Sequence, residues 1–364
     1  MARTVSRRQA LGFRVRAQQL ERTAGSLTDT AVLDLGVQDT GPDGGPWALA
    51  LRGVDAGPDD ELALAWTLRG APHLYRRADL PAVAAATAPF SDADAGKRIF
   101  DAARPLAAAG IGNLAALDAV AAAMRAVVAA PMVKGEVSAR LTAALDEPFL
   151  RYCRPCAAIH PYEMPFRLAA LRAGLELEPG TSPPVLRPVP GFAPAREVPP
   201  RLDVVRGYLR LLGPARPVDV AGFLDAPVRE VRARWPADAV EVRVDGEPRW
   251  VLAADADVLA ADPPDVVRLL GPYDLFLQAR DRSLLVADAA AAKTLWPVLG
   301  RPGGVLLGGE VAGTWRARKE GRAVRVSVQL WMPPAAPARA ALAEQAERLA
   351  AHRGLALAGL DVAG

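Results

Sequence analysis

The sequence is poor in the residues that build crosslinked or metal-rich proteins. Its 364 residues include two cysteines and three histidines. Two cysteines do not make a disulfide framework, and three histidines argue against a centre built from several imidazoles. Signatures of nucleotide binding, zinc proteases and serine hydrolases are also absent. We therefore expect no metal and no cofactor.

Long hydrophobic runs are missing as well. Hydrophobic residues make up 51% of the chain, which is enough for several cores. The longest apolar stretches, such as 117–133, are rich in alanine and interrupted by charge, so none matches a membrane span. The arginines near the N-terminus are not followed by the apolar core of a signal peptide. We expect a cytoplasmic protein.

Lysine is scarce, because only four of the 44 basic residues are lysines. A GC-rich genome explains an arginine bias, and so does phosphate contact, for which guanidinium groups are well suited. The net charge of +3 does not decide between them. The distribution favours phosphate, because basic residues gather at 3–22 and 315–325 and could line one groove. The residues expected to contact DNA are Arg7, Arg8, Arg14, Arg316, Arg318 and Lys319.

The pattern of the first half alternates helices with short strands. A Gly70 turn separates two predicted strands, 61–69 and 72–76, which form a candidate wing. Proline is dense over 183–200, and this stretch is the clearest linker. Hydrophobic spacing and capping residues predict helices over 6–20, 28–37, 101–130 and 134–146.

Residues 202–253 have the element order of a winged helix. Three short helices are predicted over 203–212, 217–224 and 227–235, and proline opens the last two. Two strands follow, 239–244 and 249–253, joined by the hairpin dipeptide Asp245–Gly246. The helix-turn-helix part of such a unit reads the major groove of DNA.

The last hundred residues change character. Short alternating strands and glycine turns over 268–330, including 283–288, predict a small barrel or sandwich. An amphipathic helix over 335–353 closes the chain.

Five stretches of the chain resemble the AlkZ/YcaQ family of bacterial DNA glycosylases. They begin AVLDLGVQDT, LALAWTLRG, YLRLLGP, LLGPYDLF and LWPVLGRPGG. The corresponding ranges are 31–53, 62–75, 208–224, 269–282 and 295–328. Together they cover most of the chain.

The resemblance implies an α+β fold with three tandem winged-helix units and a C-terminal small β-barrel around a DNA channel. The expected domains are winged-helix unit 1 at 1–100, unit 2 with the linker at 101–200, unit 3 at 201–262 and the barrel at 263–364. It also implies a monofunctional enzyme, double-stranded DNA as the partner, and excision of alkylated or bulky-adduct purines. Some relatives act in self-resistance to DNA-alkylating antibiotics.

The family's catalytic motif is Gln, an apolar residue, then Asp or Gln. The matching stretch here is Gln38–Asp39–Thr40, which lacks the apolar spacer. Two registers are possible: Asp39 takes the carboxylate role after a one-residue deletion, or Thr40 fills the second slot and Asp39 points elsewhere. The catalytic candidates are therefore Gln38, Asp39 and Thr40.

A Gln–Asp pair at the end of predicted helix 28–37 has the chemistry that this reaction needs. Alkylation at N7 or N3 of a purine puts positive charge on the base, so the glycosidic bond is already weakened. A carboxylate can then activate water and stabilise an oxocarbenium-like sugar, while the Gln38 amide orients the water. The alternative is that Asp39–Thr40–Gly41–Pro42 is an ordinary helix exit and turn.

Cys153, Cys156 and His160 form a C-x₂-C-x₃-H pattern, a spacing at which thiolates can share one zinc ion. A structural zinc needs four ligands, so Glu163 or His73 would have to complete the set. The other interpretation is two packed thiols beside a hydrogen-bonded histidine, and no thioredoxin-like context supports a redox role. We expect both thiols to be reduced and metal-free.

Two further stretches place aromatic or imidazole rings beside arginines. In the family, the segment that matches Arg69–Gly70 and His73 lies on a strand, which implies phosphate contact by His73 with Arg69 and Arg76 nearby. The alternative is a strand histidine satisfied locally. Trp315 beside Arg316 could pack on a sugar–phosphate edge or be a core tryptophan beside a solvated turn.

Two functions remain open at this point. The first is a monomeric DNA glycosylase in which Gln38 places the water and Asp39 acts as the carboxylate. The second is a non-catalytic winged-helix protein, a regulator or adduct sensor, and a regulator of this kind would bind a palindrome as a dimer.

Overall fold

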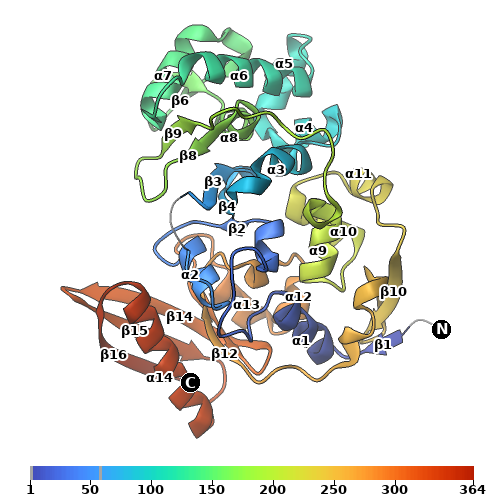
Figure 1. The fold of residues 1–364 in the computed structure, drawn as a ribbon, viewed down its shortest axis with the longest axis vertical. Helices are drawn as coiled ribbons and strands as arrows, with labels where there is room; N and C mark the ends of the chain where they lie inside the picture. Colours follow the sequence, from blue (N-terminus) through green and yellow to red (C-terminus); the bar gives the residue numbers. More distant parts are fainter. Residues whose placement is uncertain (1–2, 57–59) are drawn as a thin grey trace. The chain divides into compact units, whose positions relative to one another are not determined.

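The computed structural model describes residues 3–56 and 60–364 and has a mixed α+β fold (Figure 1). The chain divides into two compact units. Unit 1 combines Met1–Ala56, Arg206–Val220 and Pro236–Gly364, and unit 2 combines Gly57–Val205 and Ala221–Trp235. The four consecutive domains expected from the sequence differ from this division, because unit 1 joins both ends of the chain.

Unit 1 begins with a short strand and a capped helix. The Ser6 side chain accepts a hydrogen bond from the backbone N–H of Gln9, and the Gln9 side chain accepts one from the backbone N–H of Ser6. This capping box satisfies two free N–H groups and starts the helix as predicted. The elements are β1 (Arg3–Val5), α1 (Arg7–Ala17), β2 (Val37–Gln38) and α2 (Gly45–Ala50).

The predicted helix over 28–37 is wrong. The segment holds one 3₁₀ turn, Ala31–Asp34, followed by the two-residue strand β2. Gly36 has a φ of 91°, which ends the turn before a helix can continue. Val32 and Leu33 are buried, so the apolar spacing reflected burial rather than a helical period.

Residues 202–253, predicted to form a winged helix, contain the expected helices and strands in the expected order. Asp245 and Gly246 have φ values of 47° and 86°, the left-handed conformations of a tight hairpin turn. Strand β1 pairs in parallel with β10 and extends this hairpin to three strands. The elements are α9 (Val204–Leu212), α10 (Pro217–Leu224), α11 (Val228–Ala233), β10 (Ala239–Val244) and β11 (Glu247–Leu252).

The C-terminal strands form an open sheet in the order β12-β13-β14-β15-β16, so the predicted barrel is not closed. Strand β16, which the sequence analysis missed, pairs in parallel with β15. The helix α14 connects β15 to β16 and packs against both, and against β12 (Figure 1). Because α14 covers one face, the sheet does not need to close on itself. The strands are β12 (Val267–Leu270), β13 (Gly303–Leu307), β14 (Glu310–Glu320), β15 (Ala323–Leu330) and β16 (Ala356–Ala363).

The helices of this region correct one more expectation. Residues 283–288 were expected to form a strand, but Arg282–Leu285 is a helical turn, α12. Leu284 and Leu285 are both buried, and a short apolar run does not distinguish a strand from a buried helix. The helices are α12 (Arg282–Leu285), α13 (Ala289–Leu295) and α14 (Ala336–His352).

The strands of unit 2 follow the order β4-β3-β8-β9-β5, and each neighbouring pair is antiparallel. The two strands predicted around the Gly70 turn are confirmed as the β3–β4 hairpin. The predicted linker 183–200 is wrong in part, because Val185–Pro188 is the strand β9, with strand partners on both sides. The strands are β3 (Leu62–Trp66), β4 (Pro72–Arg76), β5 (Met132–Val133), β8 (Leu175–Leu177) and β9 (Val185–Pro188).

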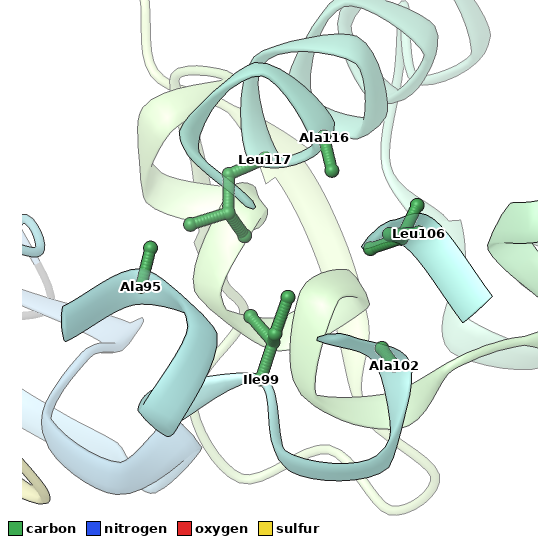
Figure 2. Close-up of a cluster of buried hydrophobic side chains, with 6 residues drawn as sticks. All are labelled: Ala95, Ile99, Ala102, Leu106, Ala116 and Leu117. Atoms are coloured by element: carbon green, nitrogen blue, oxygen red, sulfur yellow. The ribbon is translucent and has the colours of Figure 1, made fainter. Parts of the chain in front are cut away.

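The helices of unit 2 pack around an alanine- and leucine-rich cluster. The predicted helix over 101–130 divides into α5 and α6 at Gly110, whose φ is 73°. Figure 2 shows Ile99, Leu106 and Leu117 converging from three segments into this core. A two-stranded sheet pairs β6 (Leu150–Cys153) with β7 (Ala158–Pro161). The helices are α3 (Leu80–Thr87), α4 (Asp92–Arg98), α5 (Ala103–Ala108), α6 (Asn113–Val127), α7 (Lys134–Ala144) and α8 (Glu163–Arg172).

Within residues 3–56 and 60–364, no single helix has the length and apolar character needed to cross a membrane. One pair, Phe100–Ala108 with Asn113–Val127, passes that test by length and composition together, with a bend of 102° between its halves.

Candidate functional site

The predicted catalytic stretch lies at the end of β2 and in the turn before α2. Gln38 is the last residue of β2, and Asp39 and Thr40 follow it directly. All three residues are partly exposed. The turn needs glycine, because a Cβ on Gly44 would lie 2.4 Å from Oδ1 of Asp39 and 2.7 Å from the backbone nitrogen of Thr40.

Asp39 is held by the start of α2. Its Oδ1 accepts a hydrogen bond of 2.8 Å from the backbone N–H of Gly45, one of the N–H groups that a helix start leaves free. Burial raises the pKa of the Asp39 carboxyl, and this hydrogen bond opposes the rise only in part. The carboxylate therefore has a structural partner on the side of α2.

Gln38 and Thr40 contact each other instead. Nε2 of Gln38 donates a hydrogen bond of 3.1 Å to Oγ1 of Thr40. The Asp39 side chain instead bonds to Gly45, so the Gln38 and Thr40 side chains lie together and that of Asp39 has a different partner. The structure thus brings together Gln38 and Thr40, the pair of the second register.

The supports of this turn come from distant parts of unit 1 and were missed by the sequence analysis. Nε1 of Trp47 donates a hydrogen bond of 2.8 Å to the carbonyl of Leu269, and Arg353 forms an ion pair with Asp43. The ring of His352 packs on Trp47 with centroids 5.2 Å apart. These partners lie more than 200 residues away in sequence, and no local pattern identifies such contacts.

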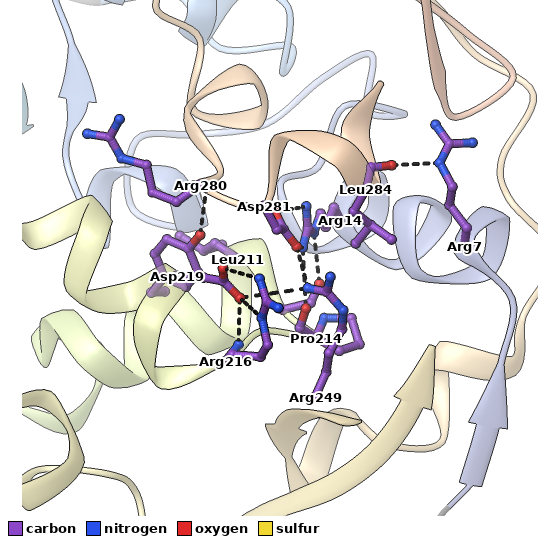
Figure 3. Close-up of polar contacts among 12 residues, drawn as sticks. Arg7, Arg14, Leu211, Pro214, Arg216, Asp219, Arg249, Arg280, Asp281 and Leu284 are labelled. Atoms are coloured by element: carbon purple, nitrogen blue, oxygen red, sulfur yellow. Dashed lines mark hydrogen bonds and ion pairs between the residues drawn. The ribbon is translucent and has the colours of Figure 1, made fainter. Parts of the chain in front are cut away.

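The prediction that Arg14 of α1 contacts DNA is wrong. Arg14 is fully buried, and its guanidinium donates to Oδ1 and Oδ2 of Asp281 at 3.1 and 2.7 Å and to the carbonyl of Gly213 at 3.1 Å (Figure 3). A group with these internal partners and no solvent contact does not reach a phosphate. Arg7 is half-buried and bound to Glu310 and the carbonyl of Leu284.

Arg8 is the exposed arginine of this helix. It has no hydrogen bond or ion pair to another described residue. Its guanidinium is therefore available to an outside anion.

The second basic cluster lies on β14. Trp315 is buried, and its indole N–H donates a hydrogen bond of 2.8 Å to the carbonyl of Leu270, so it is a core residue and not a sugar–phosphate contact. Arg316, Arg318 and Lys319 are exposed. The helix α1 packs near the start of β14 at Glu310. At about 3.3 Å per residue, Arg316 lies roughly 20 Å further along β14 than Glu310.

The predicted phosphate contact at His73 is wrong. The ring is 1% exposed, and Nδ1 lies 2.9 Å from the carbonyl of Ala71 and 3.1 Å from Oγ1 of Thr67. Burial, with the nearby charge of Arg69, lowers the pKa of His73 to about 3. A neutral, enclosed imidazole is the locally satisfied strand histidine that the sequence left as an alternative.

The two arginines beside His73 have internal partners. The guanidinium of Arg69 lies 4.5 Å from the centre of the Phe223 ring and donates a hydrogen bond of 2.6 Å to the Phe223 carbonyl. Arg76 forms an ion pair of 3.3 Å with Asp79. Both side chains are partly exposed, so phosphate contact through them stays a prediction.

These features define a class of protein: an α+β chain with winged-helix element order, exposed arginines, and a Gln–Thr pair at the end of a short strand. A sequence model of the family described as DNA glycosylase AlkZ-like matches residues 32–352. The chain belongs to this family, and membership supports a role as a DNA glycosylase in repair, a hydrolase of N-glycosidic bonds.

Among solved structures, the fold is similar to that of Streptomyces sahachiroi DNA glycosylase AlkZ. The two chains are 20% identical with a TM-score of 0.71, and the match covers 99% of this chain and 100% of that one. None of the curated proteins compared with the chain matches it.

Proposed function

We propose that this protein excises purines carrying a positive charge from N7 or N3 alkylation, including bulky adducts, from double-stranded DNA. Gln38 and Thr40 hold the attacking water. The single observation that carries this assignment is the hydrogen bond from Nε2 of Gln38 to Oγ1 of Thr40, with Asp39 bonded to Gly45 instead.

The chemistry of such a pair suits a substrate that is already activated. The amide oxygen of Gln38 accepts a hydrogen bond from water, and the Thr40 hydroxyl both donates and accepts. As the bond from C1′ to the purine breaks, its electron pair moves to the cationic base, which leaves neutral. Water adds to C1′, and its proton passes to solvent. A pair without charge contributes orientation more than electrostatic stabilisation, so uncharged lesions are poor substrates.

We propose that α9, α10, α11 and the β10–β11 hairpin act as one winged helix of a three-unit arrangement on DNA. Arg8, Arg316, Arg318 and Lys319 then contact phosphates. Their exposure supports this role. The protein binds as a monomer without strong sequence preference, and affinity falls with salt with a log–log slope of roughly −3 or steeper.

The test is base excision under single-turnover conditions. Duplexes containing N7-methylguanine, a bulky N7 adduct or an uncharged lesion are incubated with the full chain, and alkali-labile abasic sites are measured. We expect cleavage at the two cationic lesions and little at the uncharged one.

Four variants decide between the two registers. Gln38→Ala should lose about 100-fold or more in rate and Thr40→Ala about tenfold, because water is no longer oriented. Thr40→Asp should gain about tenfold, because a carboxylate beside Gln38 stabilises the oxocarbenium. Asp39→Asn, the matched control, should stay within about threefold. Loss in Asp39→Asn with full activity in Thr40→Ala would instead assign Asp39 as the carboxylate.

The second candidate function is adduct or DNA binding without catalysis. Thr40 in the slot that holds Asp or Gln in the family favours it. Release of no base from any alkylated duplex by the wild-type chain, together with salt-dependent DNA binding, would establish this function in place of excision.

A further inference from the structure

The β6–β7 hairpin of unit 2 brings three soft ligands to one end, and this feature is independent of the proposed function. Cys153 closes β6, Cys156 lies in the connecting turn, and His160 lies on β7, where it pairs with Arg151. One ligand atom from each of these three side chains lies within 4.8 Å of the other two. The turn is closed by the bond from the Ala157 N–H to the Arg154 carbonyl.

The polar groups around the cluster are arranged for metal binding. The sulfur of Cys153 accepts a hydrogen bond from the backbone N–H of Cys156 and forms another with the His160 side chain. Nδ1 of His160 lies 2.9 Å from the Pro161 carbonyl and donates to it. The lone pair is then on Nε2, the nitrogen that can bind a metal when the hydrogen bond between the His160 and Cys153 side chains is replaced. A histidine ligand fixed by a carbonyl on its other nitrogen is the usual arrangement in metal sites.

The separations fit zinc after a small side-chain movement. With Zn–S near 2.3 Å and Zn–N near 2.0–2.1 Å, a tetrahedral ion holds two sulfurs about 3.8 Å apart and a sulfur and nitrogen about 3.6 Å apart. The ligand atoms lie within 4.8 Å of one another, so they need to approach by about 1 Å at most. Cys153 and His160 are partly exposed and Cys156 is exposed, which leaves their side chains room to turn.

The hairpin packs on α7 through β7, but the paired apolar side chains near its turn are largely exposed. Each strand has four residues, and the Tyr152 and Ile159 side chains, paired across the strands, are 63% and 58% exposed. A two-stranded hairpin of this length is marginal in water without added support. A metal that binds both ends of the turn supplies that support.

We propose that Cys153, Cys156 and His160 bind one Zn²⁺ ion through two thiolates and one imidazole, with the fourth position open to solvent. Glu163 is not needed as the fourth ligand, because its Oε1 is shared by Lys134 at 2.7 Å and Arg167 at 2.6 Å. Two thiolates with an imidazole select zinc over calcium and magnesium, which prefer oxygen. This assignment replaces the sequence-based expectation of metal-free thiols.

The test measures zinc and thiols on the full chain, reduced and then incubated with Zn²⁺ and desalted. Because the chain has two cysteines, a thiol reagent reports on this site alone. We expect about one zinc per chain by elemental analysis, and two thiols that react with the reagent only after a chelator is added. Substitution with Co²⁺ should give the intense visible absorption of thiolate ligands.

Three variants and one control test whether these side chains bind the ion. Cys153→Ser, Cys156→Ser and His160→Ala should each weaken zinc affinity at least about 100-fold, since loss of an outer contact alone costs 10–100-fold. Tyr152→Ser, an exposed substitution on the same hairpin, should bind zinc as the wild type does. Thiols equally reactive with and without chelator, an intramolecular disulfide in place of zinc, or zinc retained by all four variants would each overturn the assignment.

Discussion

Whether a polar side chain of this protein is exposed or buried depends on its partners more than on its residue type. Arg8 and Arg14 lie on the same helix, yet Arg8 is exposed and Arg14 is enclosed by Asp281 and backbone carbonyls. His73 likewise lies in an arginine-rich stretch but is buried and neutral. Sequence composition identified the basic stretches, while burial determines which of their side chains are exposed and can contact DNA.

The neutral state of His73 predicts a pH-dependent stability. Its pKa is lowered by burial from 6.5 to about 3, so below pH 6.5 the unfolded chain takes up a proton that the folded chain does not. Stability is therefore present above pH 6.5 and lost as pH falls toward 3. His73→Phe should shrink the loss between pH 7.5 and 5 by about 2 kcal/mol, measured by urea unfolding at both pH values. An unchanged difference would mean that His73 is charged in the folded state.

At the scale of elements, the helices opened by proline and the Asp–Gly hairpin turn were predicted correctly. The prolines at the start of α10 and α11 and the Asp245–Gly246 turn lie where expected, whereas the capping box of Ser6 and Gln9 was found only in the structure. The errors fell at 28–37, 183–200 and 283–288. There the apolar or proline pattern was compatible with more than one structure, and pairing or burial by distant residues decided the outcome.

The capping box of α1 can be tested by one substitution. Ser6→Ala removes the acceptor for the Gln9 N–H and should cost about 1 kcal/mol in the free energy of unfolding. Ser138→Ala replaces a serine inside α7 that caps nothing and should be neutral or slightly stabilising, because alanine is the better helix former. Equal effects of the two changes would mean that the Ser6 cap does not stabilise the folded protein.

At the scale of the whole molecule, buried charge ties distant segments of unit 1 together. Asp281 is fully buried and accepts hydrogen bonds from Arg14 of α1 and, at 2.6 Å, from Arg249 of β11 (Figure 3). Arg249 also lies 3.8 Å from Asp219 of α10. A single carboxylate therefore connects residues up to 267 positions apart and joins α1 to β11.

Removal of the Asp281 carboxylate should destabilise the folded protein. Asp281→Asn leaves the buried Arg14 guanidinium without its ion-pair partner and should lower the free energy of unfolding by about 3–5 kcal/mol. Asp238→Asn is the matched control, because its ion pair with Arg206 at 2.6 Å is partly exposed and should contribute less than about 1 kcal/mol. Denaturant unfolding of both variants checks the difference, and a similar small effect in each would contradict a structural role for the buried cluster.

The sequence by itself determined the family and the order of three helices and a hairpin over 202–253, and it named the three residues that we propose as the catalytic stretch. These follow from turn chemistry, hydrophobic spacing and short motifs, which are local properties of the chain. Only the tertiary structure decided that Gln38 meets Thr40 while Asp39 meets Gly45, that Arg14 is internal, and that the C-terminal sheet stays open beneath α14. Each of these depends on which side chains and strands become neighbours after folding, and a local pattern does not contain that information.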